Sequence, residues 1–156
     1  EEKLLKKKTN KLKFITLRLG TITGVSQGMR FHTAVNKFCF KTVLRESIPV
    51  WNNAIDQYRP YLSLEDAIKT MLLIINHKKF DNQIYNVLTA NHTVRQVLMM
   101  IKKLKYKMNI IKTKSPILNQ NSYKVSRKKI ERFKIKFNKN IFKDIKDTLN
   151  LVKSLY

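Results

Sequence analysis

The clearest helical pattern in the chain follows a rigid polar stretch around residue 60. Pro60 fixes its own φ and holds the residue before it in extended geometry. Ser63, with Asp66 three positions later, has the pattern of a variant capping box that starts a helix. Apolar residues then recur on one continuous helix face, at Ala67, Ile68, Met71, Leu72 and Ile75. Arg59 is therefore expected on a rigid extended segment just before a helix begins, where its guanidinium can chelate a phosphate.

The same apolar period predicts further helices along the chain. They are expected at residues 1–8, 29–45, 94–104, 127–133 and 141–155. The first ends in lysines, which suit the negative end of a helix dipole. Thr93 and Gln96 form a second capping-box pattern, at the start of the helix over residues 94–104.

Runs of β-branched and aromatic residues predict short strands at residues 14–19, 48–51, 83–88 and 108–111. The first run is mostly apolar, as expected of a strand that is buried on both faces of a parallel sheet. Residues 20–24 follow it as a glycine-bounded turn, which places Thr21 at the carboxyl edge of the sheet, where open α/β sheets bind ligands. The alternation of helices and strands indicates a mixed α/β fold that is mostly helical by residue count.

The composition is that of a globular domain with a large positive charge. The chain has 156 residues, enough to bury a core, and a formal net charge of +23. The excess is greatest after residue 100, where 17 basic residues meet three acidic ones. A polyanionic partner would explain such an excess. A general bias in residue usage would also explain the excess of positive charge. The abundance of Lys, Ile and Asn along the whole chain favours this second interpretation.

The cysteines and histidines of the chain argue against a disulfide-bonded protein and against a metal-binding protein. Cys39 is the only cysteine and lies in an apolar run, which predicts a buried thiol in a reducing compartment. His32, His77 and His92 are far apart without a carboxylate or cysteine pattern around them, so no metal site is expected. No apolar run approaches the ~20 residues of a membrane span, and the first residues lack a signal-peptide core, so a cytoplasmic location without membrane contact is expected.

Four segments resemble, in order, motifs of the NAD-dependent epimerases/dehydratases, the extended branch of the short-chain dehydrogenase/reductases. They are Leu-Arg-Leu-Gly-Thr-Ile-Thr-Gly at 17–24, Met-Arg-Phe-His-Thr-Ala-Val-Asn at 29–36, Arg-Pro-Tyr-Leu-Ser-Leu-Glu-Asp at 59–66 and Gln-Ile-Tyr-Asn-Val-Leu at 83–88. A fifth, Asn-Ser-Tyr-Lys-Val-Ser at 121–126, is similar to the family's Arg-Ser-Tyr-x-Val-Asp/Ser. Asn121 stands there in place of the usual Arg, so one anion-gripping charge is missing.

The resemblance covers the family's C-terminal portion and implies roles for single residues. Residues 1–24 would be the end of the Rossmann-like part and residues 25–156 the substrate-binding lobe, together a single partial domain over residues 1–156. Arg59 would contact the diphosphate of a nucleotide sugar, and Asn36 would support it. Thr21 would lie near the sugar, and Leu19 near the nicotinamide of NAD(P).

The groups that the family uses for chemistry are not found in this sequence. Gly20, Gly24 and Gly28 do not have the spacing of a dinucleotide-binding loop, and no Tyr is followed by Lys four positions later; Tyr123 is followed by Arg127. The chain alone is therefore expected to bind no NAD(P) and to be inactive. It would be a fragment, a split-gene product that pairs with a separately encoded Rossmann half, or a decayed remnant.

One alternative belongs to another class of protein. A small basic nucleic-acid-binding protein would use the lysine-rich helices between residues 102 and 146 for phosphate contacts. No nucleic-acid-binding motif accompanies these lysines, and the aromatic residues among them have the pattern of core residues.

Overall fold

The computed structural model describes residues 2–7, 12–114 and 121–156. Its helices are α1 (Glu2–Lys7), α2 (Ala34–Val43), α3 (Leu64–Asn76), α4 (Val94–Lys103), α5 (Lys128–Glu131) and α6 (Phe142–Leu155). Its strands are β1 (Ile15–Leu19), β2 (Thr21–Thr23), β3 (Ser47–Trp51), β4 (Tyr58–Ser63), β5 (Gln83–Val87), β6 (Ala90–Thr93) and β7 (Asn109–Thr113). This is the mixed α/β fold that the sequence predicts. Among the described residues, no helix has the length and hydrophobicity needed to cross a membrane.

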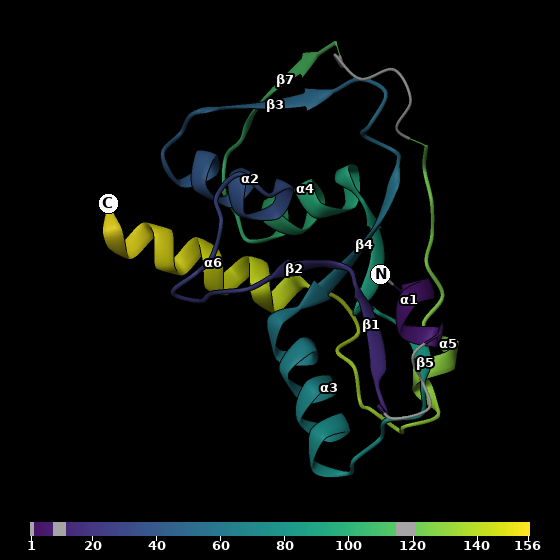
Figure 1. Ribbon diagram of the computed structural model, residues 1–156. Coiled ribbons are helices and arrows are strands. Elements are labelled where there is room, and N and C mark those ends of the chain that lie inside the picture. Colours follow the sequence, from purple (N-terminus) through teal and green to yellow (C-terminus); the bar gives the residue numbers. More distant parts are fainter. Residues whose placement is uncertain (1, 8–11, 115–120) are drawn as a thin grey trace.

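The strands pair in three small groups, mostly in parallel. β1 pairs with β5 and β3 with β7, both parallel. β4 lies in the middle of the third group, parallel to β2 and antiparallel to β6. Figure 1 shows β3 and β7 at one end of the molecule, α2, α4 and α6 in the middle, and β1 and β5 toward the other end.

Two hydrophobic clusters hold these parts together. The larger lies among α2, α4, α6 and β3, and its fully buried members include Cys39, Ile48, Ile101, Ile145 and Leu149. The smaller packs β4, β5 and α3 against α5, through Leu62, Ala67, Tyr85, Val87 and Ile130. Burial raises the pKa of the Cys39 thiol to about 12, so this cysteine is a packed core residue, as its apolar run predicts.

The first strand forms where predicted but is not buried on both faces. β1 pairs only with β5 among the described residues, and Leu19 is 39% exposed. Ile15 and Leu17 are only partly buried against the smaller cluster. The prediction of burial on both faces is therefore wrong for the described residues, which also provide a paired strand on only one edge of β1.

The glycine-bounded turn after β1 instead contains a short strand. Residues 21–23 form β2 and pair with β4, since two threonines and an isoleucine suit an extended strand.

The predicted helix over residues 29–45 is shorter in the structure. α2 begins only after Thr33, whose hydroxyl donates to the Arg30 carbonyl in a preceding turn. The helix expected over 127–133 is reduced to α5, and β6 has no counterpart among the predicted strands.

The two predicted capping boxes have different outcomes. At α4 the Thr93 hydroxyl accepts from the Gln96 backbone and the Gln96 side chain accepts from the Thr93 backbone, so this box is confirmed. At α3 the predicted box is wrong: Ser63 makes no side-chain cap. Its hydroxyl donates instead to Asp144 at 2.9 Å, and Asp66 accepts from the Thr89 hydroxyl at 2.5 Å. Both side chains of the expected box therefore form hydrogen bonds with residues distant in the sequence.

The apolar face of α3 is exposed to solvent. Its large apolar side chains are 39–59% exposed, at Ile68, Met71, Leu72 and Ile75. The buried side of the helix consists of Asp66, Ala67, Thr70 and Ile74. Amphipathic helices normally turn their apolar stripe to a core, and a contiguous exposed stripe marks an interaction surface. Figure 1 shows α3 projecting from the end of the molecule that carries β1 and β5.

Gly24, just after β2, is expected to be intolerant of any side chain. Its φ is +117°, and an added Cβ would come within 3.3 Å of both Asp144 Oδ1 and Leu64 Cβ. Gly24→Ala should lower the free energy of unfolding by roughly 1–3 kcal/mol, measured by urea denaturation. Gly28→Ala is the matched control, because nothing lies within 4 Å of the added Cβ. Equal stability of the two variants would contradict the role assigned to Gly24.

Candidate functional site

Arg59 is held in a fixed position on β4. Its Nη1 donates to the Tyr58 carbonyl at 2.8 Å and to the Asn121 carbonyl at 2.9 Å, and its Nη2 donates to Gln57 Oε1 at 2.9 Å. The guanidinium also lies over the Tyr123 ring, 5.0 Å from its centroid, which is a cation–π contact. Pro60 rigidifies the strand next to it. The cation is thus fixed between β4 and the segment 121–126.

A hollow of about 360 Å³ opens beside Arg59, between α2, β3 and β4. Its polar and aromatic lining comes from His32, Lys37, Trp51, Gln57, Arg59 and Tyr61, and the remainder is apolar. No carboxylate lines it, and two permanent cations do. A concave, mostly apolar site with a few converging charged groups is typical of a site for a small organic ligand, and here the charges select an anionic one.

A second hollow of about 420 Å³ lies at the carboxyl ends of β1 and β5. Its lining includes Arg18, Leu19, Asn86, Tyr123 and Lys124. This edge of a parallel strand pair is where open α/β sheets bind ligands.

The segment 121–126 is attached to the strands by hydrogen bonds between side chains and backbone groups. The Tyr58 amide donates to Ser122 Oγ at 3.0 Å. Asn91 makes two bonds to Val125, donating to its carbonyl at 3.0 Å and accepting from its amide at 2.9 Å. Because Tyr123 lines the second hollow and also lies beneath Arg59 of the first, this segment connects the two sites.

The structure brings two of the four sequence-predicted site residues to these hollows. Arg59 lines the first and Leu19 lines the second. Thr21 is exposed on β2 and lines neither. Asn36 is buried within α2, and its amide donates to the Arg30 carbonyl at 3.1 Å, so it fixes the segment before α2 and lines neither hollow.

Sequence reasoning misses Lys37 and Tyr123 as site residues. Lys37 follows Asn36 directly in the motif at 29–36, and its side chain lines the first hollow while that of Asn36 does not. The helical period could have suggested this difference, since adjacent positions on a helix point 100° apart. Tyr123 lies within the motif at 121–126, but its place beneath Arg59 depends on a contact across 64 residues that no local pattern contains.

Buried carboxylates join the elements beneath the site. Asp144, on α6, accepts from the Thr23 hydroxyl at 2.7 Å and from the Ser63 hydroxyl at 2.9 Å. These bonds tie α6 to the ends of β2 and β4. Asp66 accepts from the Asn138 amide as well as from Thr89. Burial raises the pKa of Asp144, although both hydroxyl donors act to lower it.

The raised pKa of Asp144 predicts a pH-dependent contribution to stability. The native carboxyl holds its proton more tightly than the unfolded one, so protonation stabilises the fold fully below the ordinary aspartate pKa, near 4. This contribution is lost as the pH rises through the raised native pKa. Asp144→Asn, which both hydroxyls can still contact, should therefore gain stability relative to the natural chain as the pH rises from about 4 to 7. Urea denaturation across that range measures this difference, and parallel profiles would contradict the assignment.

Metal ions and dinucleotides bind to recognisable arrangements of side chains and strands. Among the described residues no three His, Cys, Asp or Glu side chains gather as metal ligands would. A dinucleotide needs a strand followed by a glycine-rich loop and a helix N-terminus, whereas β1 leads through Gly20 directly into β2. Gly20 packs against β4, since an added Cβ would be 3.0 Å from the Pro60 carbonyl oxygen.

Comparison with known proteins places this fold. A model of the NAD dependent epimerase/dehydratase family matches residues 3–87, more than half of the chain. The UDP-glucose 4-epimerase of Thermotoga maritima, solved with UDP-glucose, superposes with a TM-score of 0.84 at 19% identity. The UDP-glucuronic acid 4-epimerase of Bacillus cereus, solved with UDP-glucuronic acid and NAD, gives 0.82 at 15%. RMD from Pseudomonas aeruginosa, complexed with NADPH, gives 0.81 at 14%.

These matches cover nearly all of this chain but only part of each solved protein. The shares are 99% of this chain and 52% of the Thermotoga enzyme, 96% and 48% for the Bacillus enzyme, and 99% and 54% for RMD. The chain thus spans about half the length of these relatives. The alternative of a small nucleic-acid-binding protein gains no support from them. Since the family model accounts for more than half of the sequence and its motifs fall on β1, α2, β4 and β5, the chain belongs to the NAD dependent epimerase/dehydratase family.

Proposed function

We propose that this chain is the nucleotide-sugar-binding part of an NAD-dependent epimerase/dehydratase. Residues 1–24 would end the Rossmann-like part, and residues 25–156 would form the substrate lobe. The observation that carries the proposal is the hollow beside Arg59, which combines two cations with aromatic and apolar walls and has no lining carboxylate. Two of the solved relatives named above hold UDP-sugars, a ligand class with a diphosphate for the cations and a base for the apolar wall.

Each group in the hollow would have a separate task. Arg59 and Lys37 would bind the diphosphate, and the apolar wall around Trp51 would receive the base. A phosphate oxygen would exchange with one of the carbonyls that Arg59 now contacts, because charge-assisted hydrogen bonds are about twice as strong as neutral ones. Asn36 would support the diphosphate indirectly, by holding the segment that carries His32. Thr21 would lie near the sugar, and Leu19 near the nicotinamide, beside the second hollow.

The cofactor and the catalytic groups would come from a separate Rossmann half, or from another part of a longer protein. The edge of β1 that no described strand pairs with and the exposed apolar face of α3 support this, because together they offer a strand edge and an apolar stripe for contact. The solved relatives are about twice as long, which is enough chain for such a half. The buried Cys39 and the absence of any other cysteine suit a reducing compartment such as the cytoplasm.

The exposed face of α3 is expected to decide whether such a half can bind. Leu72→Glu combined with Ile75→Glu should reduce aggregation of the isolated chain and abolish its association with a separately produced Rossmann half of a family enzyme. Each glutamate would place a charge in a buried apolar contact. Size-exclusion chromatography of the mixture measures association. Met99→Glu is the control, since Met99 is 53% exposed on α4 and away from this face. Association that survives the α3 changes would exclude this surface.

Calorimetric titration tests the proposed function. Uridine and guanosine diphosphate sugars are titrated into the chain, first alone and then with a Rossmann half present. Saturable binding of one nucleotide sugar per chain is expected. Binding of duplex DNA with steep salt dependence, without any response to nucleotide sugars, would replace the proposal with the basic-protein alternative.

A further inference from the structure

A second basic concavity lies away from Arg59, at the ends of α2 and α4 and along α6. It consists of two adjoining hollows of about 440 and 670 Å³ that share Lys105, Tyr106 and Lys153. We call their union the Tyr106 groove. Its lining cations are Arg45, Lys105, Lys107, Lys146 and Lys153, and no acidic side chain lines either hollow. It shares no lining residue with the two hollows beside β4.

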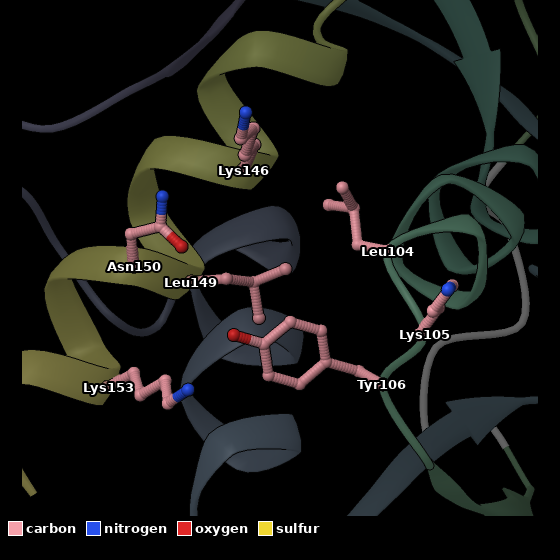
Figure 2. A pocket seen from close by; sticks show the side chains of 7 residues that line it. All are labelled: Leu104, Lys105, Tyr106, Lys146, Leu149, Asn150 and Lys153. Atoms are coloured by element: carbon pink, nitrogen blue, oxygen red, sulfur yellow. The ribbon is translucent and has the colours of Figure 1, made fainter.

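Two of the cations of the groove lie along one face of α6. Lys146, Asn150 and Lys153 lie at positions i, i+4 and i+7 of α6, so they share one helix face, and the two lysines are about 10 Å apart along the axis. Figure 2 shows Tyr106 reaching from the segment after α4 toward α6, with Lys153 extending toward its ring and Lys146 farther along the helix. Leu104 and Leu149 form the apolar floor.

None of these five cations has a carboxylate partner among the described residues. The ion pairs elsewhere occupy most of the acidic side chains. The two acids adjacent in sequence to these cations are paired with other lysines, Glu46 with Lys41 at 2.7 Å and Asp147 with Lys143 at 2.8 Å. Cations in or just after the last turn of a helix can be accounted for by the helix dipole, which applies to Arg45, Lys105 and Lys153. Lys146 lies in the second turn of α6, where the dipole does not stabilise a cation. The mutual repulsion in the groove is therefore left for an external anion to relieve.

We propose that the Tyr106 groove binds a short chain of linked phosphates, as found in inorganic triphosphate or in the triphosphate of a nucleotide. Lys146 and Lys153, about 10 Å apart along α6, and Lys105 from the segment after α4 present point charges to successive phosphates. The groove offers one half-buried aromatic ring, whereas sites for single-stranded nucleic acid stack successive bases on several rings. Asn150 and the Tyr106 hydroxyl add uncharged hydrogen-bonding groups for phosphate oxygens.

Titration with inorganic triphosphate tests this site, at about 0.1 M salt so that remote charges are screened. Lys146→Glu combined with Lys153→Glu should weaken binding at least tenfold. Lys112→Glu combined with Lys114→Glu is the control, because these exposed lysines lie outside both hollows and change the net charge equally. The control should change affinity less than about twofold, since charges farther apart than a Debye length interact weakly.

Further titrations distinguish inorganic triphosphate from a nucleoside triphosphate and from single-stranded nucleic acid as the ligand. Tyr106→Leu should weaken binding of a nucleoside triphosphate without affecting inorganic triphosphate, if the base contacts the ring. Equal loss in the groove and control variants would overturn the proposal, as would the absence of triphosphate binding to the natural chain. A single-stranded DNA oligomer that binds more tightly than triphosphate, and that loses affinity in the groove variant, would assign the groove to nucleic acid instead.

Discussion

The chain alone is expected to turn over no nucleotide sugar in the presence of NAD or NADP. Chemistry in this family, as the resemblance implies, needs a Tyr acid/base whose pKa is lowered by a Lys four positions later, and a glycine-rich loop for the cofactor. In this sequence no Tyr has that lysine, and the three glycines at 20, 24 and 28 lack the loop spacing. We therefore expect neither general acid–base catalysis nor cofactor chemistry from the chain alone, and no detectable turnover.

To measure turnover, UDP-glucose is incubated for a long time with the chain and NAD, and any product is detected by chromatography. The matched reaction adds a separately produced Rossmann half from a family enzyme, which should restore activity if the β1 edge and the α3 face dock it. Product from the chain alone would show that the described residues contain a catalytic group that the family comparison does not reveal.

Replacing Arg59 by Ala should weaken binding of a nucleotide sugar by roughly 1.5–3 kcal/mol, about 10- to 150-fold, the scale of a charged hydrogen bond. Two losses combine in this estimate. The cation that faces the diphosphate disappears, and the Asn121 carbonyl loses its donor, which loosens the wall formed by segment 121–126. Arg59→Lys should also weaken binding, because an ammonium cannot reproduce the planar fork that contacts Tyr58, Asn121 and Gln57 together.

Calorimetric titration measures these affinities, with thermal denaturation as a check that each variant is folded. Arg132→Ala is the control for loss of one positive charge, since Arg132 pairs with Asp81 outside both hollows beside β4. Its affinity should match that of the natural chain. Equal affinity of the natural chain and Arg59→Ala would remove Arg59 from the site.

Helix starts that depend on interactions within a few residues could be predicted from the sequence. Caps and strands that depend on contacts with distant residues could not. The capping box of Thr93 and Gln96 lies within four residues, and α4 begins where it predicts. The box of Ser63 and Asp66 has the same local form, yet Asp144 and Thr89 bind both side chains from 81 and 23 residues away. β2 and β6 are also set by a partner, because each pairs with β4 and neither has a strong apolar alternation of its own.

The candidate site follows the same division. Arg59 and Leu19 could be placed from motifs that keep a rigid strand in register, and both line hollows. Lys37, Tyr123 and Asp144 could not, because their importance comes from where α2, segment 121–126 and α6 meet β4. The apolar stripe of α3 predicts the helix correctly, yet among the described residues its large apolar side chains remain 39–59% exposed.

The most direct test of the central claim is a map of backbone amide chemical shifts on an isotope-labelled chain during titration with UDP-glucose and a GDP-sugar. If the hollow beside Arg59 binds the diphosphate, shifts should concentrate at His32, Lys37, Trp51, residues 57–61 and residues 121–126. The Tyr106 groove should respond to triphosphate only. Shifts confined to that groove, or no shifts at any concentration of either nucleotide sugar, would contradict the account.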